Sequence, residues 1–173
     1  MIEDFVEEFA RYRKTAERAI QQVTDEALNT VVSGDINSIA VIIRHMSGNF
    51  ASRFTGFLSS DGEKPWRDRD SEFEDRRYTR EEIERIWAEG WTVLEVALSA
   101  LTDEHLQQRV LIRGQPWTVH DALCRSIAHA AQHVGQIVLL ARILTAGNWK
   151  SISIPRGKSR EYNINPTKER KPE

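Results

Sequence analysis

The segment Ser126–Gln136 has the sequence SIAHAAQHVGQ, which places two histidines four residues apart in a run of small and apolar residues. On a helix, positions i and i+4 differ by about 40° of rotation and one turn of rise, so His129 and His133 project side by side. Two neighbouring imidazoles can share one ligand. The alanines and the glycine around them let neighbouring helices come close and leave room for a cavity. The spacing therefore indicates a candidate site on one helix face.

His45 is the candidate third member of this site, because it lies in the most apolar segment of the chain. Burying neutral imidazoles without partners costs about 1–3 kcal/mol each, so each buried ring needs a partner. Three histidines from two central helices present a trigonal face to a divalent ion and leave positions open for water, which is typical of catalytic metal sites. The alternative is that each histidine is a core or boundary residue that forms hydrogen bonds with its surroundings.

The residue types restrict the chemistry of such a site. An HxxxH motif alone is weak evidence for a metal. Ala130 stands where the HExxH metalloproteases have their glutamate base, so that class is excluded. A ligand set of histidines suits Zn, Ni, Cu or Fe better than Mg or Ca, which prefer oxygen. A bound zinc lowers the pKa of water toward about 7 or holds a thiol as its thiolate, and either product is a nucleophile at neutral pH.

Four polar residues lie within one or two helical turns of the histidines on the same predicted helices. Asn49 follows His45 by one turn and Gln136 follows the last histidine by three residues, so both are candidates for hydrogen bonds to the ligands or for substrate contacts. The alternative is that they are polar rim residues. Arg53 and Arg125 are candidates for binding an anionic substrate, although ordinary surface arginines are the favoured interpretation.

The other histidines and the cysteine are weaker candidates. His105 lies in a polar connection and His120 in the first turn of a predicted helix, so we expect solvent-facing or capping roles for both. Cys124 precedes His129 by five residues, about 140° around the helix, and we expect it to be a buried, inert thiol on another face. As the single cysteine in the sequence it forms no internal disulfide and no thiolate-rich metal site.

Four amphipathic segments are available to position these residues. Apolar residues recur at helical spacing in residues 2–23, 39–58, 80–101 and 119–144. Asn37 or Ser38 can cap the second segment, Thr79 with Glu82 forms a capping-box pattern before the third, and Thr118 can cap the fourth. The fold class that we predict is all-α: a four-helix bundle with a short hairpin before its last helix.

The connections between the helices differ in length and character. Residues 60–78 are polar and contain Pro65, which predicts a long loop with at most one short helical turn, of the kind that is often functional. Residues 109–117 alternate loosely around Gly114 and predict the hairpin. After Trp149 there are too few apolar residues for a fifth packed helix. We therefore expect one domain over residues 1–163 and a flexible basic tail over residues 164–173.

Composition narrows the class of protein. A chain of 173 residues with 40% hydrophobic and 29% charged residues is typical of one globular domain. A net charge of −2 argues against a nucleic-acid partner. The longest apolar runs are shorter than the roughly 18 residues that span a membrane, and the N-terminus lacks a signal-peptide pattern. These features predict a cytoplasmic protein that is not embedded in a membrane.

Together, the motifs IIRHMSGNF around His45, AHAAQHVGQI around the histidine pair, and VLLAR with Arg142 resemble the DinB/YfiT-like metalloenzymes. Members of that family have one histidine in the second helix and an HxxxH pair in the fourth. The loop sequence SSDGEKPWRDRD and the tail sequence SISIPRGKSREYN resemble a narrower, uncharacterised subgroup. The resemblance covers about residues 1–163 and implies a four-helix bundle.

The resemblance also implies a divalent metal, zinc or nickel, held by His45, His129 and His133, and frequently a homodimer. Some relatives of this kind are thiol-dependent transferases or isomerases that use low-molecular-weight thiols such as bacillithiol or mycothiol. The subgroup's loop and tail do not belong to those characterised transferases. The implied substrate is therefore an unspecified small electrophile, with a low-molecular-weight thiol as the cosubstrate.

Three hypotheses for function follow. The first is a metal-dependent enzyme, a transferase or hydrolase, in which the three histidines bind the ion and a water or thiol is the nucleophile. The second is a non-catalytic dimeric helical bundle whose histidines hold a structural metal or form hydrogen bonds within the core. The third, a nucleic-acid-binding module, is opposed by the charge balance.

Overall fold

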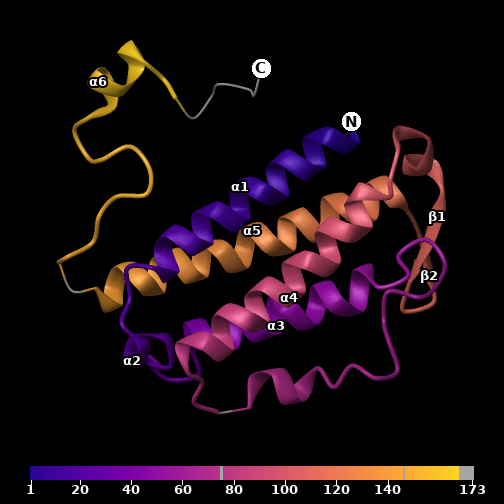
Figure 1. The fold of residues 1–173 in the computed structure, drawn as a ribbon, viewed down its shortest axis with the longest axis horizontal. Helices are drawn as coiled ribbons and strands as arrows, with labels where there is room; N and C mark the ends of the chain where they lie inside the picture. The colour runs from indigo at the N-terminus through magenta and orange to yellow at the C-terminus, as the bar shows by residue number, and fades with distance from the viewer. Residues whose placement is uncertain (75, 146, 168–173) are drawn as a thin grey trace.

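Four long helices lie side by side and form the body of the structure, a computed structural model that describes residues 1–74, 76–145 and 147–167. The helices are α1 (Ile2–Ile20), α3 (Ile39–Phe54), α4 (Arg80–Ser99) and α5 (Val119–Leu144). Helix α1 packs along α5, α3 packs along α4, and α3 also contacts α5 (Figure 1). The predicted all-α class is confirmed, with one small two-stranded sheet as the addition.

Side-chain caps begin three of the long helices where the sequence predicts them. The hydroxyls of Ser38, Thr79 and Thr118 each accept a hydrogen bond from the backbone N–H three residues further on. Glu82 returns a bond to the Thr79 N–H, which completes the capping box. Such caps satisfy N–H groups that the first helical turn leaves without partners, and each contributes about 1 kcal/mol.

Helix ends are less well predicted than helix starts. Helix α3 ends at Phe54, four residues before the predicted end, and Gly56 follows with a φ of 58° in the left-handed region. The first and third segments also end two or three residues early, at Ile20 and Ser99. The short helix α2 (Asp25–Leu28), capped by Thr24, was not predicted. Apolar spacing continues past these ends because the following turns also pack against the core.

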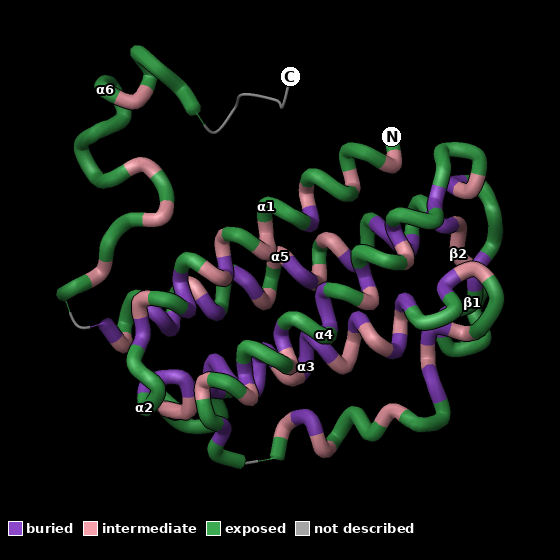
Figure 2. Tube along the Cα trace, viewed as in Figure 1, coloured by how far each residue is buried: buried purple, intermediate pink, exposed green. Residues whose placement is uncertain are grey.

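The core lies between the long helices, where their buried faces meet (Figure 2). Phe9 of α1 meets Phe50 and Phe54 of α3 and Trp91 of α4, with ring centroids 6.4 Å apart in edge-to-face arrangements. A side chain at Gly90 would overlap the backbone of Ser47, so this glycine lets α4 approach α3 closely. Helices α3 and α4 therefore pack closely against each other.

The predicted hairpin is present. It consists of β1 (Arg109–Ile112) paired antiparallel with β2 (Gln115–Thr118). Its turn residues, Arg113 and Gly114, have φ values of 53° and 72°, as a two-residue turn of this kind requires. The Asp61 carboxylate accepts hydrogen bonds from both turn N–H groups, at 2.8 and 2.6 Å. These bonds fasten the 60–78 loop to the hairpin.

The 60–78 loop is held at both ends and crosses the outside of α3. At its far end Asn29 and Tyr78 exchange two hydrogen bonds, of 3.0 and 2.8 Å. The predicted single turn is a 3₁₀ helix, η1 (Asp70–Phe73), which packs on α3. A second such helix, η2 (Asp103–Gln107), precedes the hairpin. The described part of the loop therefore packs on α3 through η1.

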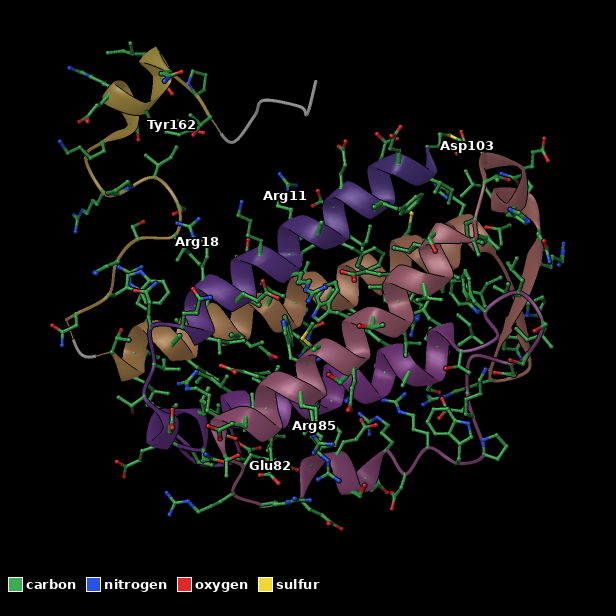
Figure 3. The ribbon with its side chains drawn as sticks, in the orientation of Figure 1. Arg11, Arg18, Glu82, Arg85, Asp103 and Tyr162 are labelled. Atoms are coloured by element: carbon green, nitrogen blue, oxygen red, sulfur yellow. The ribbon has the colours of Figure 1, made fainter. Side chains whose placement is uncertain are left out.

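Polar contacts hold the N-terminus and the beginning of the C-terminal segment. Asp103, labelled in Figure 3 near the N-terminus, accepts a 2.7 Å hydrogen bond from the Ile2 N–H. Arg18 donates to the Ile152 carbonyl, so the start of the C-terminal segment lies against α1. The sequence argued against a fifth packed helix, and the short helix α6 (Ser159–Ile164) has no buried residue. Most of the predicted flexible tail, residues 168–173, lies outside the described residues.

One described helix, α5, has the length and hydropathy of a membrane span. The short apolar runs in the sequence did not predict this. Nine of its residues are buried in the structure, and it packs along α1 and α3. Leu139 and Ile143 of α5 are exposed, so packing within the protein accounts for only part of its apolar character.

Candidate metal centre

The three predicted histidines come together on one side of the α3–α5 contact. The Nε2 atom of His129 lies 3.2 Å from Nε2 of His45 and 3.1 Å from Nε2 of His133. One nitrogen from each of the three residues lies within 4.8 Å of the others. His45 is buried, and the pair on α5 is half-buried. Residues 84 positions apart in the chain thus form one cluster of ring nitrogens.

A buried glutamate from the 60–78 loop orients His45. The Glu72 carboxylate lies 2.9 Å from Nδ1 of His45 and also receives two hydrogen bonds from Arg67, of 2.8 and 3.0 Å. The side chains of Glu72 and Arg67 are only 7% and 3% exposed. Burial raises the pKa of a carboxyl, but the bonds from His45 and Arg67 outweigh that effect and hold the pKa of Glu72 below its usual value. The ionised carboxylate therefore accepts the Nδ1 proton of His45.

A glycine in α3 makes room for this carboxylate. A side chain at Gly48 would overlap the Glu72 carboxylate, because η1 lies directly on α3 at this point. Gly48 lies three residues after His45, nearly one turn along the helix. The motif HMSGN thus contains both the histidine and the space in which its partner lies.

Gln136 has the corresponding role for His133. Its Oε1 atom lies 2.8 Å from Nδ1 of His133, and since a carbonyl oxygen only accepts, the proton lies on Nδ1. The Nε2 atoms of both His45 and His133 therefore present lone pairs toward His129. Oxygen partners that fix the tautomer of a histidine in this way are typical of metal-binding imidazoles.

The cluster cannot satisfy its own hydrogen-bonding needs. Nε2 of His129 faces two lone pairs and can donate one proton to only one of them. Its Nδ1 atom is buried and has no hydrogen-bond partner among the described residues. Burial, followed by the neighbouring His133 and His45, lowers the pKa of His129 to about 3. Burial also lowers the pKa of His133, although the bond to Gln136 opposes the shift. Both rings are thus neutral at pH 7, as ligands must be.

The dimensions of the cluster suit a small cation. Nitrogens about 2.0–2.1 Å from a tetrahedral zinc lie about 3.3 Å from one another. Two of the Nε2 separations, 3.2 and 3.1 Å, are close to that value, and the three ligand nitrogens all lie within 4.8 Å of one another. A cation among the three nitrogens would take up the lone pairs that no protein donor reaches. The donor set and its surroundings therefore fit a divalent metal of the zinc or nickel type.

A cavity of about 370 Å³ opens beside the imidazoles of His45 and His129. The structure places three of the four polar candidates in its wall, namely Asn49, Arg53 and Arg125. Gln136 lies outside this wall, against His133. The preference for Arg53 as an ordinary surface residue is wrong, because one of its guanidinium nitrogens, Nη1, is fully buried.

The weaker candidates lie outside the cluster. His105 accepts a 2.9 Å hydrogen bond from the Thr102 N–H, the capping role that was expected. His120 is exposed, with Nδ1 3.2 Å from the Asp121 carboxylate. The expectation of a buried Cys124 is wrong: its thiol is exposed and lies 3.8 Å from Nε2 of His120.

Sequence reasoning missed Glu72 and Arg67. Both lie in a stretch, RDRDSEFEDRR, in which acidic and basic residues alternate without a pattern that distinguishes a buried pair from a solvated one. Phe73 is the one apolar residue in that stretch, and its ring centroid lies 4.8 Å from that of His45. An aromatic residue in a charged loop is the signal that could have located the contact with α3.

Comparison with known families gives one match. The model of a family described as a protein of unknown function, DUF1572, matches residues 1–158. No curated protein and no solved structure shows significant similarity to the chain.

Proposed function

We infer the function of this chain, which belongs to the DUF1572 family, from its histidine cluster, because the family description assigns no activity. The proposed function is that of a metal-dependent enzyme that acts on a small molecule. His45, His129 and His133 would hold a divalent ion, and the cavity beside them would hold the substrate.

One observation carries this proposal: three imidazoles converge through Nε2 beside a cavity of about 370 Å³. A structural metal site is closed by four protein ligands, whereas a catalytic site has three and an open position. Among the described residues no Asp, Glu or Cys joins the three histidines as a fourth ligand. His45 and His129 line the cavity, so the open position would lie beside a bound substrate.

The protein groups around the cluster have separate tasks. Glu72 and Gln136 hold the protons on Nδ1 and direct two Nε2 lone pairs inward. Arg67 keeps Glu72 ionised and in place. Asn49 and Gln132 line the cavity, where their amides would orient a substrate. A bound zinc or nickel would supply a Lewis acid that lowers the pKa of a water or thiol.

The finer features of the proposal come from the resemblance to the DinB/YfiT-like metalloenzymes. On that basis we propose that the four long helices form the bundle of that family, and that a low-molecular-weight thiol attacks a small electrophile. The implied homodimer and the cytoplasmic location remain predictions, and sedimentation velocity measures the first of them.

Cobalt substitution tests the proposed open position. Co²⁺ bound by three imidazoles gives visible absorption bands that change when another ligand enters its coordination sphere. We expect these bands in untagged wild-type protein, a new sulfur-to-cobalt band when 2-mercaptoethanol is added, and neither in the His129→Ala variant. The His105→Ala variant is the matched control and should behave as the wild type.

The alternative is a non-catalytic protein with a structural metal or with hydrogen-bonded core histidines. Cobalt bands that do not change with any added thiol, azide or imidazole would show a closed site and favour the structural metal. Absence of cobalt binding would favour the core histidines. Either result would overturn the enzymatic proposal.

A further inference from the structure

The cavity beside the histidine cluster has a strongly positive wall. Five arginines line it, from α3, the 60–78 loop, the hairpin turn and α5: Arg53, Arg67, Arg69, Arg113 and Arg125. Its lining contains no aspartate or glutamate. The whole chain has a net charge of −2, so this concentration of positive charge is local and is not a consequence of a basic protein.

Three of these arginines already have acidic partners. Arg67 binds the Glu72 carboxylate through two nitrogens. Arg113 lies 3.0 Å from Glu63, and Arg69 lies 4.0 Å from Asp70. Arg53 and Arg125 form no ion pair with any described residue. Two guanidinium groups therefore remain for a ligand.

Arg53 is the more unusual of the two. Its Nη1 atom is fully buried and has no hydrogen-bond partner among the described residues. Burial lowers the pKa of this guanidinium, Glu63 opposes the shift, and the neighbouring Arg67, Arg113 and Arg125 lower the pKa further. A side chain at Gly62 would overlap Cδ and Nη1 of Arg53, so the loop leaves space for the guanidinium. An unpartnered buried charge of this kind is costly unless a ligand satisfies it.

Arg125 is oriented by an aromatic ring. Its guanidinium carbon lies 5.5 Å from the ring centroid of Trp117, a cation–π contact that helps to hold the side chain in the cavity wall. Arg53 follows His45 on α3, and Arg125 precedes His129 on α5. The two guanidinium groups thus line the same cavity as the two imidazoles.

We propose that this cavity binds an anionic small molecule, with a carboxylate or phosphoryl group held by Arg53 and Arg125 and the remainder of the molecule directed toward His45 and His129. The second half of this statement rests on the proposed enzymatic function, whereas the anion site does not. Guanidinium groups suit both kinds of anion because their fork of N–H donors matches two oxygens at once.

Isothermal titration of metal-free protein, prepared with a chelator and dialysed, tests the anion site without interference from a metal. The probes are inorganic phosphate and malonate, which distinguish a phosphoryl ligand from a carboxylate ligand. We expect saturable binding of at least one probe to the wild type and a Kd at least about tenfold higher in the Arg53→Met and Arg125→Met variants. The Arg142→Met variant removes an exposed arginine from the same helix and is the control.

Each outcome decides the matter. No saturable binding of either probe would overturn the proposal. Equal weakening of anion binding in Arg142→Met would also overturn it, because it would show a general charge effect. If Arg53→Met fails to fold by circular dichroism, Arg125→Met decides alone. Retained anion binding in a protein that takes up no metal would overturn the proposed function and leave the anion site in place. Metal uptake without anion binding would overturn the anion site and leave the proposed function in place.

Discussion

Replacing Glu72 with glutamine keeps the shape of the side chain and removes its charge. Glu72 accepts from Nδ1 of His45 at 2.9 Å and pairs with Arg67, and all three side chains are at most 7% exposed. Mutation of the residue that orients a metal-binding histidine typically lowers metal affinity about 10–100-fold, and here the carboxylate is replaced by a weaker, uncharged acceptor. Arg67 would also be left as a buried cation, and breaking such a pair costs up to about 3–5 kcal/mol. We therefore expect weaker zinc binding and lower stability together.

The two effects can be separated. Zinc affinity is measured by competition with a chromophoric chelator, and stability by urea unfolding of the metal-free protein. The double variant Arg67→Met/Glu72→Gln removes the unpaired cation, so it should regain stability while its zinc affinity stays low. Glu74→Gln, an exposed change in the same loop, is the control. Unchanged zinc affinity in Glu72→Gln, with the variant folded, would refute the proposed role of Glu72.

Three further predictions follow from the same contacts. Gly48→Ala should lower zinc affinity, because the new methyl group overlaps the Glu72 carboxylate, and a chelator competition that shows wild-type affinity would contradict this. Gly90→Ala should cost about 1–3 kcal/mol in urea unfolding, because its methyl group meets the Ser47 backbone; a more stable variant would show that α4 can shift. The metal-free protein should lose stability as the pH falls from about 6.5 toward 3. In this range His129 binds a proton in the unfolded chain, where its pKa is about 6.5, but not in the folded chain, where its pKa is about 3. Thermal unfolding measured across that pH range checks this loss of stability, and a stability that rises toward pH 4 would contradict it.

The helices and the histidine cluster could be predicted because their signals are local. Ser38, Thr79 and Thr118 cap helices through bonds to residues three positions away, which sequence spacing shows directly. The pair His129 and His133 is adjacent on any helix. The pairing with His45 required the further inference that the most apolar segment lies at the centre of the fold.

The remaining parts of the site depend on contacts that spacing does not encode. Glu72 meets His45 only because the 60–78 loop is fastened at both ends, by Asp61 to the hairpin turn and by Asn29 to Tyr78. Single-sequence reasoning finds neither attachment. For the same reason Arg53 was expected at the surface, although the loop that passes over α3 brings Gly62 against it.

Metal content measured by inductively coupled plasma mass spectrometry shows whether the three histidines bind an ion. The samples are untagged wild-type protein, the His133→Ala variant and the His105→Ala control, each incubated with zinc or nickel and then dialysed. The account predicts about one ion per chain in the wild type and in His105→Ala, and a large loss in His133→Ala. No retained ion in the wild type would mean that the three converging imidazoles are core histidines and would contradict the account.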